Sequence, residues 1–543
     1  MGLRVPYAGI SDNLLVVSTS VDAVTPATSR AYDPYAHRYL IAAGVILGAV
    51  MELIDTSIVN VALADIGSNL GATLDELTWV ITGYILSAIV VLPMTGWLAA
   101  RFGRRRYFLT SVAMFTIASL FCGTASSLLS LVFWRIVQGL GGGALIATAQ
   151  AILFDAFPPN QKTVAAAIFG LGMIVGPAIG PTLGGVIVTK YAWPWIFYVN
   201  IPVGAMSMLL VSAFVHDNPE HRQPPGRIDV VGIALLAIGL ASLQFVLERG
   251  EHYDWFDSRL IVGLFGVAVI ALGAMLVWEI RSENPVLDLH VLRDRSLAAG
   301  SLFAVALGFA LYGSIFTEPL FMQNILHYDA ETSGWLLFPG AVAAAIVMIP
   351  MARLGNKVDA RWTVSIGAVL LAFSMWQHSH LTAEAGRHNW FWPIVTRGLG
   401  TGMIFVPLTA AAVSNLHGRL LGHGTALFNL ARQLGGSIGL AIMSTYITRD
   451  VATNRAVLVE HVSRYGVGTQ MRVGAMQHAF ESHGFNPMTA LHQALAALDG
   501  IVTQQAYVLA FEHLYLWIGL VMLASLPLVF LLRRPQQMTM PGH

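Results

Sequence analysis

Two acids and one arginine stand within stretches that are otherwise apolar. Glu52 and Asp55 lie three residues apart in the run 39–63, so in a helix they share one face. Arg135 lies in the run 128–153. Because an ionisable side chain is costly inside a bilayer, each of these residues indicates a pathway for a substrate or an ion. A desolvated carboxylate beside a movable counter-charge is suited to carry a proton, since loss of the partner favours the protonated form.

The helical rise places these charges at a similar depth. At 1.5 Å per residue, Asp55 lies roughly 20–24 Å from the start of its run, and Arg135 lies roughly 10 Å from the opposite boundary. We therefore expect Asp55, with Glu52 beside it, to pair with Arg135 in the outer half of the membrane and to couple transport to protons. The alternative is a static salt bridge that only packs the helices.

Four residues further along the chain are weaker candidates for a second-half cavity. Arg397 and Asn429 lie in apolar runs, whereas Glu318 and Glu512 fall near the expected outer boundary. Long charged side chains at a boundary reach water at little cost, which is the alternative to a functional role for both acids.

The cluster His378, His380 and His388 has the composition of a metal site. It falls in an expected outer loop without carboxylates at ligand spacing, so surface histidines are favoured and no metal site is predicted. The chain also lacks a P-loop, a G-x-S-x-G turn and an H-E-x-x-H helix. We therefore predict neither an enzyme nor a bound cofactor, and any pumping must draw on an ion gradient, with protons as the coupling ion.

A stripe without side chains runs along the expected helix 164–189. It consists of Gly172, Gly176, Gly180 and Gly184, with Pro177, Pro181 and Gly185 beside it. Such a stripe lets membrane helices approach closely, and neighbouring helices satisfy the backbone groups that the prolines leave open. We expect a tightly packed helix with a mechanical role; a purely structural contact is the alternative.

The composition is that of a membrane protein. Of the 543 residues, 56% are hydrophobic and 11% are charged, against roughly 25% charged in soluble domains. About fourteen apolar runs are long enough to cross a bilayer. The fold class predicted is therefore an all-α polytopic membrane protein. The net charge is zero and gives no sign of a nucleic-acid partner, and Cys122 is the only cysteine.

Lysine and arginine set the orientation. Loops on the side of the N-terminus carry about nineteen of them, and the short loops on the other side about four. This bias predicts an inner-membrane protein with both termini in the cytoplasm. The expected spans are 39–63, 77–100, 107–127, 128–153, 164–189, 195–216, 229–247, 259–280, 297–320, 333–352, 362–378, 391–416, 425–448 and 507–532.

The spans divide into two halves, and the sequences around Arg135 and Arg397 are weakly similar. The long outer loop is either a surface hairpin or an element that docks a partner. The expected parts are a cytoplasmic tail 1–38, a six-helix bundle 39–216, a linker 217–228, two inserted helices 229–280, a second six-helix bundle 281–532 that contains the outer loop 449–505, and a tail 533–543.

Five stretches resemble the major facilitator superfamily, and within it the fourteen-span drug:proton antiporters of the EmrB/QacA type. These are LIDTSIVNVAL at 53–63, LVFWRIVQG at 131–139, GMIVGPAIGPTLGG at 172–185, WIFYVNIPVG at 195–204 and NLARQLGGSIG at 429–439. The resemblance implies the major facilitator fold, with two six-helix bundles and two extra helices between them. It also implies a cytoplasmic gate loop at 96–105, formed by Gly96, Arg101, Gly103, Arg104 and Arg105.

The resemblance implies proton-coupled export of amphipathic or hydrophobic small molecules by alternating access. Membrane lipids are the surroundings, and a periplasmic adaptor with an outer-membrane channel is implied if the source is Gram-negative. Ala100 departs from the family, which usually has aspartate there, so a latch that uses this carboxylate is in doubt. The alternatives are a dedicated exporter of one metabolite, such as a siderophore or a fatty acid, and a transport-silent membrane sensor or scaffold.

Overall fold

The computed structural model describes residues 37–217, 229–282, 285–354, 358–463 and 465–532. These residues form helices joined by short loops, and no strand occurs among them. The tails 1–36 and 533–543 and most of the linker 217–228 lie outside the described residues.

The first half is a bundle in which two of the six expected spans are interrupted. The span of α4 and α5 is broken at Gly143, and that of α7 and α8 at Val199. The helices are α1 (Arg38–Leu70), α2 (Leu74–Phe102), α3 (Arg104–Gly123), α4 (Leu128–Gly142), α5 (Leu145–Ala156), α6 (Lys162–Lys190), α7 (Trp195–Tyr198) and α8 (Asn200–Phe214).

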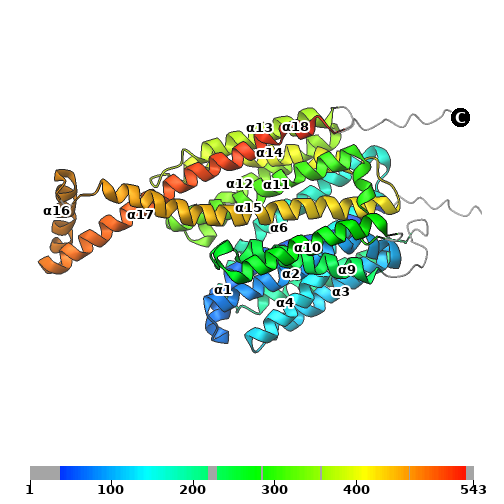
Figure 1. The fold of residues 1–543 in the computed structure, drawn as a ribbon, viewed down its shortest axis with the longest axis horizontal. Coiled ribbons are helices and arrows are strands. Elements are labelled where there is room, and N and C mark those ends of the chain that lie inside the picture. The colour runs from blue at the N-terminus through cyan, green and yellow to red at the C-terminus, as the bar shows by residue number, and fades with distance from the viewer. Residues whose placement is uncertain (1–36, 218–228, 283–284, 355–357, 464, 533–543) are drawn as a thin grey trace, which may run out of the picture.

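Two further helices and a second bundle follow (Figure 1). The helices are α9 (Val230–Arg249), α10 (Arg259–Arg281), α11 (Arg295–Asn324), α12 (Ala330–Leu354), α13 (Ala360–His378), α14 (Arg387–Ala412), α15 (Arg419–Glu460), α16 (Val467–Ser482), α17 (Pro487–Ala524) and α18 (Leu526–Val529).

Polar residues in the loops begin several of these helices. Thr73 and Glu76 form a capping box at α2, in which the Glu76 carboxylate accepts the Thr73 backbone N–H at 2.9 Å. Asp294 caps α11 through the Leu297 N–H at 2.9 Å. Each cap satisfies a backbone donor that the first turn leaves open, so the loop sequences determine where the helices start.

Eleven helices within the described residues are long and apolar enough to cross a membrane, which defines a multi-pass membrane protein. The apolar part of α6 is shorter, at Lys162–Pro177. The remaining expected spans coincide with α13 and α15. Each expected span thus falls on a helix, while the count of fourteen crossings stays a prediction.

The loops gather at two ends of the bundle, which we call the Arg104 end and the α16 end. At the Arg104 end, the ring of His37 lies 5.2 Å from that of Phe214, and Arg361 Nε donates to the Leu532 carbonyl at 2.7 Å. The first and last described helical segments therefore start and finish at the same end. This is the end that the lysine and arginine bias predicts to be cytoplasmic.

The segment 449–505, expected as an outer loop, is largely helical and forms a hairpin. α15 continues without a break to Glu460, and α17 starts at Pro487 (Figure 1). The two helices extend beyond the bundle, with α16 across their tips. Arg455 on α15 bonds Asp499 on α17 at 2.5 Å. A buried i, i+4 row on α17, formed by Ala490, Ala494, Leu498, Val502 and Ala506, explains why this polar stretch forms a helix.

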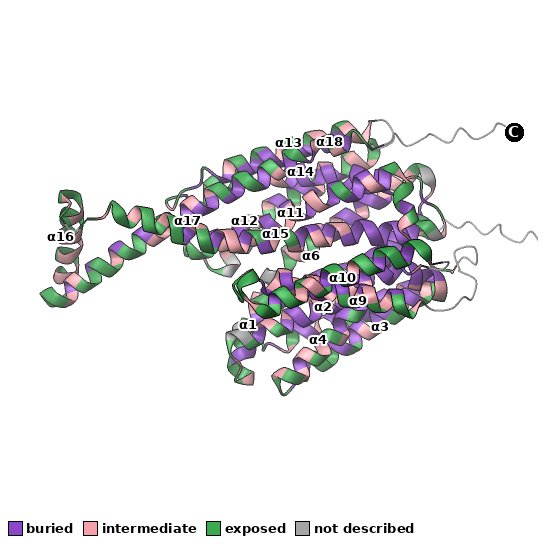
Figure 2. Ribbon diagram, in the orientation of Figure 1, coloured by how far each residue is buried: buried purple, intermediate pink, exposed green. Residues whose placement is uncertain are grey.

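The inserted pair α9 and α10 lies along one side of the two bundles. Arg249 stacks over Trp79 of α2 at 5.3 Å, and Gln244 donates to Ser437 of α15 at 3.0 Å. α9 therefore contacts both halves. α10 is largely exposed (Figure 2), as expected for a helix that faces lipid.

Candidate functional site

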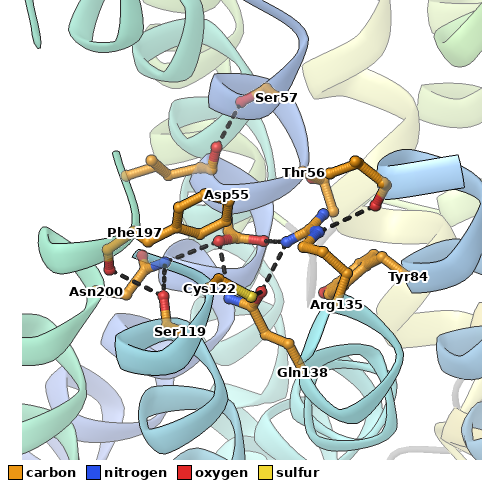
Figure 3. A network of polar contacts seen from close by, with 12 residues as sticks. Asp55, Thr56, Ser57, Tyr84, Ser119, Cys122, Arg135, Gln138, Phe197 and Asn200 are labelled. Atoms are coloured by element: carbon orange, nitrogen blue, oxygen red, sulfur yellow. Dashed lines mark hydrogen bonds and ion pairs between the residues drawn. The ribbon is translucent and has the colours of Figure 1, made fainter. Parts of the chain in front are cut away.

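Asp55 of α1 and Arg135 of α4 form a buried ion pair. Arg135 Nη1 lies 2.5 Å from Asp55 Oδ2, and the two side chains are 1% and 0% exposed (Figure 3). The contact expected from their depths is therefore present. Two opposite charges that are removed from water are each less costly as a pair than alone.

Further donors surround the Asp55 carboxylate. Its Oδ1 accepts from Gln138 Nε2 at 2.9 Å and from Asn200 Nδ2 at 2.8 Å (Figure 3). Asn200 also donates to Ser119 at 3.0 Å. The Asp55 carboxylate is thus contacted by three donors, from Arg135, Gln138 and Asn200.

Arg135 is fixed by groups other than the acid. Its Nε donates to the Val80 carbonyl at 3.1 Å, and its Nη1 to Gln138 Oε1 at 2.8 Å. The guanidinium also lies 4.3 Å from the ring centre of Tyr84. These contacts would keep Arg135 in its position if Asp55 became neutral.

Sequence reasoning did not assign Gln138, Asn200, Ser119 or Tyr84 to this site. Gln138 and Asn200 stand inside the stretches 131–139 and 195–204, which were used only to recognise a family. Gln138 lies three residues after Arg135, so helical spacing alone places both on one face. That spacing is the signal that could have found it.

Glu52 does not share the partners of Asp55. It is 8% exposed, its Oε2 has no hydrogen bond, and Arg432 of α15 is the positive charge that acts on it most strongly. The two acids on this helix therefore have different nearest positive charges, although Tyr84 is close enough to interact with both. Asp55 faces α4, and Glu52 interacts with the second half.

The glycine stripe of α6 packs against α1. Added Cβ atoms at Gly172, Gly176, Gly180 and Gly184 would meet, in that order, Ile46, Leu53, Ser57 and Ile58. The helix that carries Asp55 therefore lies directly on the stripe. Gly170, outside the stripe, meets Met348 and Phe405 of the second half instead.

Gly185, beside the stripe, does not share its contact with a neighbouring helix. Gly185 has no atom within 4 Å of an added Cβ, so it takes no part in the contact. α6 runs as one helix through Pro177 and Pro181, and the side chain of Pro181 lies outside the description.

The gate loop 96–105 lies at the Arg104 end, where acids other than residue 100 hold it. Arg104 Nη1 lies 3.0 Å from Asp155, and the Arg105 backbone N–H donates to Asp217 at 2.9 Å. Gly103 has a φ of +91°, and an added Cβ would lie 2.4 Å from Asp217. Ala100 is buried, so the charge partners of this loop are Asp155 and Asp217.

Arg101 stacks at 5.8 Å from the ring of Trp97, within its own helix α2.

Three contacts close the interface between the halves near the Arg104 end. Arg104 Nη2 donates to the Gly418 carbonyl at 2.5 Å, and Asn429 donates to Gln150 at 2.5 Å. Gly96 lies against His423, where an added Cβ would be 2.7 Å from the His423 Cα and N. Backbone atoms cannot rotate away, so the halves can close here only around a glycine.

We expect Gly96→Ala to open this interface. Overpacking costs about 1–3 kcal/mol, enough to raise an open population roughly tenfold. The measurement is the maleimide labelling rate of Gln150→Cys, which is buried, in a Cys122→Ala background and lipid nanodiscs. Gly422→Ala is the control, because its Cβ would have an ordinary 3.6 Å contact with Gly96. Equal labelling in the two variants contradicts the role of Gly96.

The second half holds its own buried charges. Arg397 Nη1 lies 2.8 Å from Glu318 Oε2, and His378 Nε2 lies 3.4 Å from Glu318 Oε1. Glu318 and His378 are both completely buried in the structure. The expectations that Glu318 reaches the boundary water and that His378 lies on the surface are therefore wrong. α11 continues past the predicted span to Asn324, and α14 and α17 cover His378 with Trp390 and Tyr515.

The other second-half candidates lie elsewhere. Asn429 accepts from Arg432 Nη2 at 3.4 Å, so it belongs to the interface near Glu52. Glu512 is half-buried on α17, and its neighbour His513 lies 3.4 Å from Asp450.

The Major Facilitator Superfamily model matches residues 45–440. The chain therefore belongs to the major facilitator superfamily, as the sequence motifs predict. It is 34% identical over 492 residues to the multidrug export protein EmrB of Escherichia coli K12, covering 90% of this chain and 94% of that protein. It is 32% identical over 500 residues to the fatty acid resistance protein FarB of Neisseria gonorrhoeae, with 92% and 96% covered.

Solved structures share the fold. The human organic anion transporter MFSD10 aligns with a TM-score of 0.56 at 15% identity, covering 89% of this chain and 99% of that one. The proton:xylose symporter XylE aligns with a TM-score of 0.54 at 12% identity, with 90% and 95% covered. The predicted fold class is confirmed.

Proposed function

We propose that this protein exports amphipathic or hydrophobic small molecules across the inner membrane in exchange for protons. The observation that carries this proposal is the buried ion pair of Asp55 and Arg135. A proton that binds Asp55 removes its attraction to Arg135, which its other contacts hold in place, and α1 becomes free to move away from α4. One proton that crosses 100 mV supplies about 2.3 kcal/mol, a bias of roughly fifty-fold.

The packing of α1 connects this proton to movement. α1 carries Asp55 and lies on the glycine stripe of α6, while Gly170 of α6 meets Met348 and Phe405 of the second half. A shift of α1 is therefore passed through α6 to the interface between the halves. The contacts at the Arg104 end would serve as the cytoplasmic gate in alternating access, closed in this conformation.

The relatives support a hydrophobic substrate, and they leave open whether the protein exports many compounds or one class. The name of EmrB favours a multidrug exporter, and that of FarB favours a dedicated exporter of fatty acids. A panel of dyes, drugs, siderophores and long-chain fatty acids tested in inverted vesicles distinguishes them. Proton movement with many unrelated compounds supports a multidrug pump, movement with one class supports a dedicated exporter, and no movement with any supports a sensor or scaffold.

The helical hairpin 449–505 is our candidate for docking a periplasmic adaptor, which would lead to an outer-membrane channel in a Gram-negative cell. α16 has no buried residue, and the hairpin extends beyond the bundle (Figure 1). We expect an adaptor to co-purify with the full chain and to be lost when residues 461–486 are replaced by a short linker. Retention of the adaptor by the shortened chain contradicts this role.

A further inference from the structure

We propose that Glu318 and His378 form a second proton-binding site, in the second half of the protein, with Arg397 as its movable counter-charge. This inference rests on the proposed proton-coupled export. It assigns a coupling role to a side-chain cluster separate from Asp55.

The hydrogen bonds of His378 determine which ring nitrogen can take a proton. Its Nδ1 lies 2.8 Å from the Ser374 carbonyl oxygen, which can only accept, so Nδ1 carries a hydrogen. In the neutral ring Nε2 then has a lone pair. That nitrogen faces Glu318 Oε1 at 3.4 Å, so an acceptor lies opposite an acceptor.

One proton fills this gap. Taken from water, it binds Glu318 Oε1 and is donated to His378 Nε2, or binds Nε2 and is donated to Oε1. No well-aligned hydrogen bond satisfies either oxygen of Glu318 or Nε2 of His378, although all three are buried. Without the proton, the 2.8 Å ion pair with Arg397 balances the carboxylate; with it, the cluster has one more positive charge and Arg397 is released.

None of the described neighbours of Glu318 and His378 donates a hydrogen bond that would take the place of this proton. Tyr515 of α17 and Trp390 of α14 lie with ring centres 5.2 and 5.7 Å from His378. α15 presents Met443 against Gly313, and the ionisable residues of α12 are Glu331 and Arg353, near its two ends. Arg397 is 15% exposed while Glu318 and His378 are completely buried, so the site has one partly accessible side.

The cluster lies on helices of the second half that are equivalent to those of the Asp55 site. Asp55 lies on the first helix of its half and Arg135 on the fourth span; Glu318 lies on the first helix of the second half and Arg397 on the fourth. Repeated halves commonly place their sites at equivalent positions. The third helix supplies Ser119 in one half and His378 in the other.

The test counts protons. The full chain is reconstituted in liposomes with the voltage clamped, and the steady accumulation of ethidium is measured against the imposed pH difference. The slope of the logarithm of accumulation against pH difference gives the number of protons exchanged per dye. We expect a slope of two for the native chain and of one for Glu318→Gln.

His378→Gln keeps the ion pair of Glu318 with Arg397, so it guards against a folding failure of the first variant, and its expected slope is also one. Glu384→Gln, which changes an exposed carboxylate in the loop between α13 and α14, is the control and should keep the slope of two. A native slope of two that persists in both cluster variants, or a native slope of one, overturns this inference alone. A native slope of zero overturns the proposed function and this inference with it.

Discussion

Asp55→Asn is expected to abolish export driven by a proton gradient while leaving some substrate binding. An amide cannot exchange a proton, so α1, the helix that passes movement to α6, no longer responds to the gradient, and the bias of roughly fifty-fold per proton at 100 mV is lost there. A proton at the second-half cluster alone does not move α1. The measurement is uphill dye export in reconstituted liposomes, with dye binding measured separately on the same preparation. Asp65→Asn is the matched control, because Asp65 is an exposed acid on the same helix.

The variant leaves Arg135 buried without its acid, and breaking such a pair costs about 3–5 kcal/mol. If Asp55→Asn does not fold, the double variant Asp55→Asn with Arg135→Gln removes both charges and is measured in its place. Full gradient-driven export by either variant argues against Asp55 as the proton carrier.

Gly176→Val should stop transport by separating α6 from α1. An added Cβ at Gly176 would lie 2.5 Å from Leu53 Cβ, which is next to the backbone and has no freedom to rotate away. Overpacking of this kind costs about 1–3 kcal/mol, a tenfold or greater shift in a two-state equilibrium. The checks are dye export and thermal unfolding of the purified protein.

Gly185→Val is the control for this effect. Gly185 lies in the same helix, yet an added Cβ has open space around it. It should therefore keep both transport and stability. If the two valine variants have the same transport and the same stability, the contact of the stripe with α1 has no special role.

Much of the first half could be predicted from the sequence because its signals are local. Apolar runs gave the helices, and helical rise placed Asp55 and Arg135 at one depth, where the structure pairs them at 2.5 Å. The period of four in the stripe indicated a close contact. Which helix fills that contact depends on tertiary packing, and the structure identifies it as α1.

The second-half site could not be predicted in the same way. The predicted span 362–378 ends at His378, so this residue read as the start of an outer loop. α13 ends there too, but α14 and α17 bury it with Trp390 and Tyr515. Burial by helices that are distant in sequence leaves no local signal. The same holds for Asp155 and Asp217, which contact Arg104 and Arg105 of the gate loop.

The most direct test of proton-coupled export is to measure export against a concentration gradient before and after the proton gradient is collapsed. Reconstituted liposomes are loaded with dye, an inward pH and voltage difference is imposed, and ionophores then dissipate both. If export is coupled to protons, uphill export stops at once and resumes when the gradient is restored. Uphill export that continues undiminished after collapse contradicts proton exchange at Asp55.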